Sequence, residues 1–181
     1  MKFLLDAQVA ADDDEETFVS AEALFRGEAE LSRVGDLTQA EGRLVAQLDG
    51  QDLFGAFPAD PILRLVDGWL KKLPWVIGGD TETVALRNCE QCFAFVPAGE
   101  SVELSFFVGS EAEIEDYLLE PTVVRLDSFV EQSLALGKCL LELIGRQDAA
   151  LLEGNEDCRD LQTSYTEADK AWHDHQLHQR R

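Results

Sequence analysis

Hydrophobic residues follow a helical pattern most regularly over residues 129–144. They recur three and four positions apart, at Phe129, Val130, Leu134, Leu136, Leu140, Leu141, Leu143 and Ile144. This spacing predicts a helix that supplies a central part of the core. Asp127 is placed to cap its start, and Gly145 is placed to end it in the left-handed conformation. The β-branched character of residues 122–126 predicts a strand leading directly into this helix.

A second helix is predicted over residues 61–73. Asp60 can cap it, and Pro61 suits the first helical position, where its missing N–H costs nothing. One apolar stripe follows, formed by Ile62, Val66, Trp69 and Leu73. Pro74 pushes the preceding residue out of the helical region, so we expect the helix to end at residue 73.

Alternating patterns predict strands elsewhere. Residues 2–9 form one expected strand, and residues 43–48 form another that ends at the turn Asp49-Gly50. Three more runs predict an antiparallel meander, at residues 83–86, 92–96 and 102–108.

Two segments are less regular. Residues 17–34 have helical propensity, yet Gly27 and Gly35 interrupt them, and a β-hairpin of residues 17–25 and 29–34 fits equally well; we favour the hairpin. Residues 111–119 place Ile114, Tyr117 and Leu118 at spacings that predict a short acidic helix.

The last part of the chain predicts a long helix capped by Asn155. Its apolar positions form one narrow stripe: Cys158, Leu161, Tyr165, Ala168, Trp172 and His175. Such a stripe predicts docking along a single line, either on the chain's own domain or on a partner. We therefore expect an α+β domain over residues 1–145, with an antiparallel β-sheet packed against two core helices, and a C-terminal helical extension over residues 146–181.

Charge is the unusual feature of the composition. The chain has 181 residues, 36 of them acidic and 15 basic, with a formal net charge of −21. The negative charge is distributed along the chain, with −9 in residues 1–58, −9 in residues 59–145 and −3 in residues 146–181. Such a surface repels nucleic-acid phosphates and anionic membranes and attracts cationic molecules. We expect a basic protein partner, and neither nucleic acid nor membrane.

The sequence also predicts a cytoplasmic location. The apolar residues near the start are interrupted by Asp6, and no apolar run approaches the ~20 residues of a membrane span. Four cysteines are too few for a disulfide scaffold of this size, so we expect reduced thiols.

Metal and cofactor sites are not predicted. Cys89 and Cys92 have the spacing of a zinc knuckle, but a closed zinc site needs two further ligands, and only Cys139 and Cys158 remain. We interpret the pair as two thiols around a turn. The three histidines, His173, His175 and His178, lie close together near the end of the sequence, where a weak metal site or a solvated segment is expected.

No catalytic motif is recognised. The sequence contains no Gly-rich phosphate loop, no His-Glu-x-x-His helix and no Gly-x-Ser-x-Gly turn. Carboxylate pairs such as Asp80 with Glu82, or Glu113 with Asp116, are unavoidable at this composition and indicate no acid–base pair. We predict no catalytic residue.

The predicted function is that of a non-enzymatic acidic binding protein that sequesters or neutralises a basic partner. In general character it resembles the small acidic immunity proteins of toxin pairs, although no motif identifies a family. Two alternatives remain: an accessory subunit that docks through the C-terminal helix, and a metal-dependent enzyme that uses carboxylates and histidines. The aromatic pair Trp69 and Trp75 is also open to a core-packing interpretation. The candidate partner-binding residues are Asp12, Asp13, Asp14, Glu15, Glu16, Trp69, Trp75, Glu111, Glu113, Glu115, Asp116, Leu161, Tyr165 and Trp172.

Overall fold

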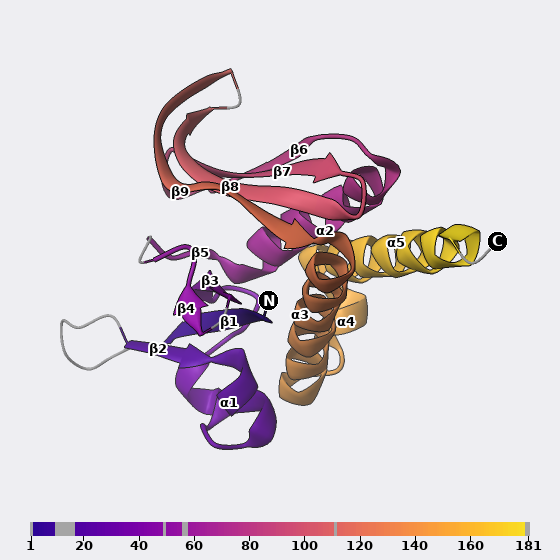
Figure 1. Ribbon diagram of the computed structural model, residues 1–181. Coiled ribbons are helices and arrows are strands. Elements are labelled where there is room, and N and C mark those ends of the chain that lie inside the picture. The colour runs from indigo at the N-terminus through magenta and orange to yellow at the C-terminus, as the bar shows by residue number, and fades with distance from the viewer. Residues whose placement is uncertain (1, 10–16, 49, 56–57, 111, 180–181) are drawn as a thin grey trace.

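Two antiparallel sheets and a group of helices make up the α+β fold (Figure 1). The computed structural model describes residues 2–9, 17–48, 50–55, 58–110 and 112–179. The fold class therefore agrees with the sequence, but the strands form two sheets where we expected one. The helix α2 (Ile62–Gly78) separates them. At a rise of 1.5 Å per residue it spans roughly 25 Å, which carries the chain from the end of the first sheet to the start of the second.

The first sheet, sheet A, has the strand order β2-β1-β3-β4, with β5 paired to β3. Its strands are β1 (Lys2–Val9), β2 (Thr17–Ser20), β3 (Glu41–Leu48), β4 (Gln51–Asp52) and β5 (Asp60–Pro61). The predicted strands at residues 2–9 and 43–48 are confirmed. Gly50 turns the chain between β3 and β4 with a φ of 82°, as the predicted Asp-Gly turn requires.

The second sheet, sheet B, has the order β6-β7-β8-β9. Its strands are β6 (Glu82–Ala85), β7 (Gln91–Ala98), β8 (Ser101–Ser110) and β9 (Glu113–Arg125). The predicted three-strand meander is confirmed as β6, β7 and β8. The short helix predicted at residues 111–119 is wrong, because Glu113–Arg125 forms a fourth strand that pairs with β8.

Helix α2 is longer than predicted. It continues through Pro74 to Gly78, and Gly79 ends it in the left-handed conformation with its N–H bonded to Val76 O at 3.1 Å. Val76 is buried, so its packing and the glycine cap offset the hydrogen bond that Pro74 cannot donate. Asp60 does not cap this helix. Its carboxylate accepts the N–H groups of Arg87 and Asn88 instead.

Helix α3 (Leu126–Gln147) contains the predicted core helix and extends beyond it at both ends. Arg125 is the N-cap residue, and Asp127 lies in the first turn, where its carboxylate accepts the N–H of Ser128 at 2.6 Å. Gly145 is inside the helix and does not end it. The last turn is held by long-range contacts, because Arg146 donates to Phe25 O at 2.7 Å and Gln147 accepts from Leu37 N at 2.9 Å.

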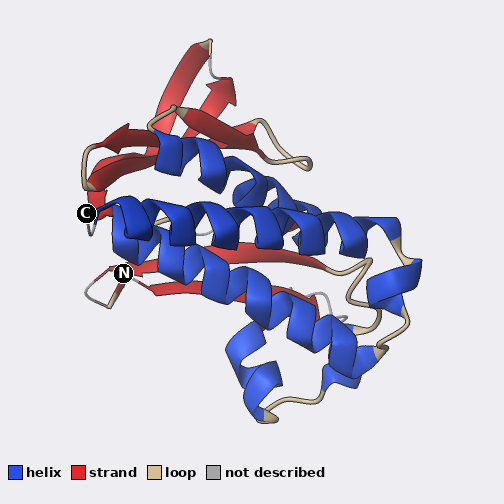
Figure 2. Cartoon of the chain, turned by 90° about the vertical axis from the view of Figure 1, so that its right-hand side faces the viewer, coloured by secondary structure: helices blue, strands red, loops and turns tan. Residues whose placement is uncertain are grey.

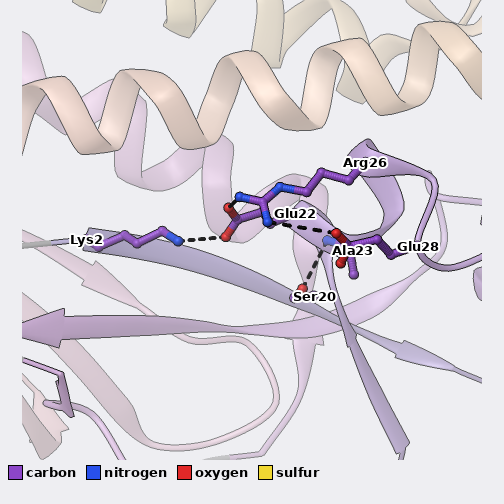
Figure 3. Close-up of polar contacts among 6 residues, drawn as sticks. All are labelled: Lys2, Ser20, Glu22, Ala23, Arg26 and Glu28. Atoms are coloured by element: carbon purple, nitrogen blue, oxygen red, sulfur yellow. Dashed lines mark hydrogen bonds and ion pairs between the residues drawn. The ribbon is translucent and has the colours of Figure 1, made fainter.

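The hairpin favoured for residues 17–34 is wrong beyond Ser20. The helix α1 (Ala21–Arg26) follows β2, and a 3₁₀ helix, η1 (Leu31–Val34), follows α1. Ser20 Oγ accepts the N–H of Ala23 at 3.1 Å, and Glu22 pairs with both Lys2 and Arg26 (Figure 3). Gly27 has a φ of 73°, so it is the helix terminus and not a hairpin turn.

The chain ends in α4 (Leu151–Gly154) and the long helix α5 (Glu156–Gln179). Asn155 Oδ1 accepts the N–H of Cys158 at 3.1 Å, which confirms the predicted cap. Helix α5 runs beside α3 and packs along α2 (Figure 2). Its buried side chains belong to the same hydrophobic cluster as those of α2 and α3. Among the described helices, none combines the length and the apolar composition needed to cross a bilayer.

Aromatic side chains fill the space between α2, α3 and sheet B. Trp69 of α2 is fully buried, with ring centroids 4.6 Å from Phe95 and 5.1 Å from Phe93. Its indole N–H donates to Ser133 Oγ of α3 at 2.9 Å. Trp69 therefore contacts two helices and one face of sheet B. The opposite face of the sheet carries exposed side chains such as Val96 and Tyr117.

Candidate partner-binding groove

Alternate residues of sheet B point to opposite faces, and the pairing register shows which belong together. The cross-strand row Phe93–Phe106–Leu119 packs on the core, whereas the next row, Cys92–Phe107–Tyr117, points away from the helices. A second outward row is Val96–Glu103–Val123. We call the outward side the outer face of sheet B, represented by Val96, Glu103, Phe107, Ile114, Tyr117 and Val123.

The outer face is unusually apolar for an exposed surface. Seven large apolar side chains are exposed among the described residues, and four of them lie on this face: Val96 at 38%, Ile114 at 43%, Tyr117 at 37% and Val123 at 62% exposure. Phe107 and Ala94 are buried beneath them as part of a small cluster that is separate from the main core. One-sided antiparallel sheets usually present polar residues to water, so this face is a candidate binding surface.

A groove crosses the outer face and takes side chains from all four strands. Its volume is about 310 Å³, and its lining includes Thr83, Val96, Glu103, Phe107, Ile114 and Tyr117. The rings of Phe107 and Tyr117 meet edge to face, with centroids 6.2 Å apart. The combination of an apolar floor and a few polar groups is typical of sites that bind another molecule.

The shape of the groove depends on the bend of the β8–β9 hairpin. Figure 1 shows the far end of this hairpin curling away from the rest of the sheet. The pairing of β8 with β9 shifts register at three places, including between Val108 and Gly109. Gly109 has a φ of 111°, and a side chain there would clash with the carbonyl oxygen of Glu113. Glycine at this position therefore permits the hairpin to close at its bend.

Charge around the groove has one sign. No Lys, Arg or His lies between Arg87 and Arg125, and the same stretch contains eight acidic residues. This stretch supplies all of β7 and β8 and nearly all of β9. Glu103 lies within the groove, and Glu113, Glu115 and Asp116 are exposed on β9. A cation that approaches this part of sheet B meets no basic side chain from β7, β8 or β9 before Arg125, the last residue of β9.

A second cavity of about 410 Å³ lies near the turn of the β8–β9 hairpin and is lined in part by Cys89, Cys92, Glu113 and Glu115. Cys89 lies in the bend before β7, and Cys92 is the second residue of β7. The thiol of Cys89 lies 3.4 Å from Gln91 Oε1, and that of Cys92 lies 3.5 Å from Gly109 O. Burial raises the pKa of the Cys89 thiol, and the nearby Asp60 carboxylate raises it further.

The histidines make local contacts on α5. His175 stacks on Trp172 with centroids 5.4 Å apart, and His178 Nδ1 lies 2.7 Å from the Asp174 carbonyl oxygen. Within the described ranges, no three His, Cys, Asp or Glu side chains are placed so that they could hold a metal ion together. Cys139 in α3 and Cys158 in α5 are the remaining thiols, and burial raises the pKa of each.

The predicted partner-binding residues fall into four groups. Glu113, Glu115 and Asp116 lie on β9 beside the groove, and Trp75 is 58% exposed near the end of α2. Trp69, Leu161 and Trp172 are buried in the chain's own core, and Tyr165 is half-buried against it, so the core-packing interpretation holds for this group. The residues Asp12, Asp13, Asp14, Glu15, Glu16 and Glu111 lie outside the described residues.

Sequence reasoning missed the apolar part of the outer face. Ile114 and Tyr117 were assigned to a helix, and Val96, Phe107 and Val123 were not considered as surface. The strand predicted at residues 122–126 is confirmed as the last part of β9, which ends at Arg125, but this signal did not extend to the part of β9 before Pro121. Pro121 is compatible with a strand at the edge of a sheet, where one side of the backbone faces solvent.

The chain matches no protein-family model, and no curated protein or solved structure compared with it is similar. The groove, the charge around it and the exposed strand beside it are the features of this chain that bear on function.

Proposed function

We propose that this chain is a non-enzymatic binding protein that holds a basic protein partner on the outer face of sheet B. The observation that carries the proposal is the coincidence of two properties on one surface. Apolar side chains are exposed there at Val96, Ile114, Tyr117 and Val123, and the stretch between Arg87 and Arg125 that supplies them contains eight acidic and no basic residues.

Each property has a separate role in binding. Burial of the apolar side chains supplies affinity, at about 25 cal/mol per Å² removed from water. The acidic groups increase the association rate and exclude acidic proteins, because like charges brought together at an interface are repelled. A partner with basic residues interleaved with apolar ones satisfies both requirements. Neutralisation of such a partner by occupation of its basic surface is the corresponding biological role.

The C-terminal helix is less suited to a partner. Its apolar stripe is buried against α2 and α3, with Leu161 fully covered. Partner binding through that stripe would first require α5 to leave its own domain. The outer face of sheet B needs no such rearrangement.

A synthetic probe tests the proposal. The basic probe is a peptide of about nine residues in which Lys alternates with Val or Tyr, long enough to span roughly 30 Å in an extended form. We expect fluorescence anisotropy to show saturable binding that weakens as salt is raised from about 50 to 300 mM, because added salt screens the attraction. A peptide with Glu in place of every Lys should not bind.

Matched charge reversals locate the site. The double variant E113K/E115K should lower affinity by about tenfold, because it places cations beside the bound peptide. The control E153K/E167K makes the same change in net charge at exposed positions of α4 and α5, and we expect a smaller loss. Equal losses in the two variants would show that only the total charge matters and would refute a site on sheet B.

Matched apolar truncations address the second property. Tyr117→Ala should weaken binding, whereas Leu177→Ala, which truncates another exposed apolar side chain on α5, should not. Urea unfolding of both variants checks that the fold persists. Unchanged affinity in Tyr117→Ala would contradict a role for the groove.

A further inference from the structure

The exposed edge of β9 is the longest strand edge in the described structure. β9 has 13 residues and ends the order of sheet B, and no other described strand pairs with its second edge. The opposite edge strand of that sheet, β6, has four residues. In sheet A the end strands β2 and β4 have four and two residues. Proteins usually protect long edges with lysines, prolines or covering segments, since an open edge is a template for another strand.

The segment Glu113–Glu120 has neither lysine nor proline, and no described strand covers its open edge; its protections are its acidic side chains and two shifts in its register with β8. It consists of four acidic and four apolar residues. All of its residues are exposed except Leu119, which is half-buried against the core. Pro121 follows and has no N–H to offer, so a strand added along β9 has its longest proline-free edge on the Glu113–Glu120 side.

We infer that an extended basic segment of the partner binds by adding a fifth strand to sheet B along Glu113–Glu120, an inference that rests on the function proposed above. Backbone hydrogen bonds to β9 supply the attachment, and side chains on alternate residues supply selectivity. The added strand extends the groove by one strand's width.

Residues on the two faces of β9 specify the sequence pattern of that segment. Ile114 and Tyr117 line the groove, whereas Glu113 and Asp116 pair with Ser110 and Val108, which alternate along β8 with the outward-facing positions. Alternate side chains of the added strand point to these two sides. The partner segment therefore alternates apolar residues, which continue the outer face, with Lys or Arg, which meet the carboxylates.

A second copy of this chain does not fit the same edge. Pairing of two β9 strands would bring the acidic groups Glu113, Glu115, Asp116 and Glu120 of one copy against those of the other, with no basic residue in either segment. Like charges opposite each other in a sheet are destabilising. The acids thus prevent self-association and favour a basic strand.

N-methylation of the basic probe tests strand addition directly. An N-methyl group removes a backbone donor, and in an added strand only every second N–H points to β9. Methylation of the set that faces β9 should lower affinity by at least about tenfold, and methylation of the alternate set should change it by about threefold or less. A peptide of the same composition with all Lys residues placed before all apolar residues should bind more weakly than the alternating probe.

Hydrogen exchange measured by NMR gives an independent readout. In the complex, the amides of Glu113–Glu120 that do not bond to β8 should gain protection, since these are the donors that point to the open edge. Binding with equal sensitivity to both methylation sets, or protection confined to amides that already bond to β8, would overturn strand addition and leave the basic-partner function intact. No binding of the unmethylated probe would overturn both. A dimer with protected β9 amides in the absence of peptide would show that a second copy occupies the edge.

Discussion

Asp60 and Asn88 are 28 positions apart in the sequence, yet Asp60 Oδ1 accepts the backbone N–H of Asn88 at 2.9 Å. The same oxygen accepts the N–H of Arg87 at 2.7 Å, and Asn88 Nδ2 returns a hydrogen bond to the Ala59 carbonyl at 2.7 Å. Asp60 is only 2% exposed. These three hydrogen bonds connect the turn between β6 and β7 to Ala59 and to β5 of sheet A. They therefore help to orient sheet B relative to sheet A.

Asp60→Ala should therefore destabilise the protein by roughly 1–3 kcal/mol, because two backbone donors lose their acceptor in a largely buried position. Asp60→Asn should cost less, since its amide oxygen can still accept one of these bonds. Urea unfolding monitored by circular dichroism measures both. Equal stability of Asp60→Ala and the unmodified protein would contradict a structural role for the hydrogen bonds of Asp60.

Two glycines in left-handed conformations provide a matched test of the hairpin bend. Gly109→Ala combines an unfavourable backbone conformation with a clash against Glu113, whereas Gly99→Ala, at a φ of 65°, meets no atom within 4 Å. We expect Gly99→Ala to cost about 1 kcal/mol, and Gly109→Ala to cost more and to weaken binding of the basic probe. Unfolding and anisotropy measurements check both effects. Indistinguishable behaviour of the two variants would show that the close approach at Gly109 has no consequence.

The cysteine thiols should react slowly in the native state. Burial raises the pKa of Cys89, Cys139 and Cys158, and only the thiolate is nucleophilic. At neutral pH, iodoacetamide should modify Cys158, which is fully covered, only as the protein unfolds. Labelling of Cys89 should continue to accelerate above about pH 8.5, the ordinary thiol pKa. Mass spectrometry of timed samples, with a urea-unfolded control, measures these rates. Rapid native labelling of Cys158 would contradict its burial.

The Glu22 carboxylate should contribute to acid sensitivity. The hydrogen bond from Lys2 lowers its pKa, so the folded state favours the ionised form. The corresponding stabilisation is present above the pKa of the unfolded chain, about 4.3, and is lost as the pH falls through the lower folded value. Glu22→Gln should remove this part of the pH dependence. Urea midpoints compared between pH 6 and pH 3 test it, and a parallel decline in both proteins would refute it.

Much of the fold could be predicted where the hydrophobic period extends over several turns. The regular spacing around Leu134 and Leu140 predicted α3, and the stripe from Cys158 to Trp172 predicted α5. The helix ends were harder to predict, because distant contacts determine them. Nothing near Gly145 indicates that the next two residues bind the segment that contains Phe25 and Leu37.

The candidate site was harder to predict than the core. In β9, the shifts in register at the bulges interrupt the strict alternation of a strand. Ile114 and Tyr117 then stand three positions apart, as they would on a helix. The role of Asp60 could not be predicted for a related reason. An aspartate before proline is typical of a helix cap, but the N–H groups that bind the Asp60 carboxylate come from the turn between β6 and β7, far along the sequence. Local patterns could not show either arrangement.

The position of α2 has a consequence for protein synthesis. One side of α2 is covered by α5, which lies about eighty residues further along the sequence. A nascent chain that has emerged only as far as sheet B exposes the uncovered side of α2 to solvent or to chaperones. Translation through residue 179 must be complete before this side can be shielded, so premature termination before α5 should yield a product prone to proteolysis.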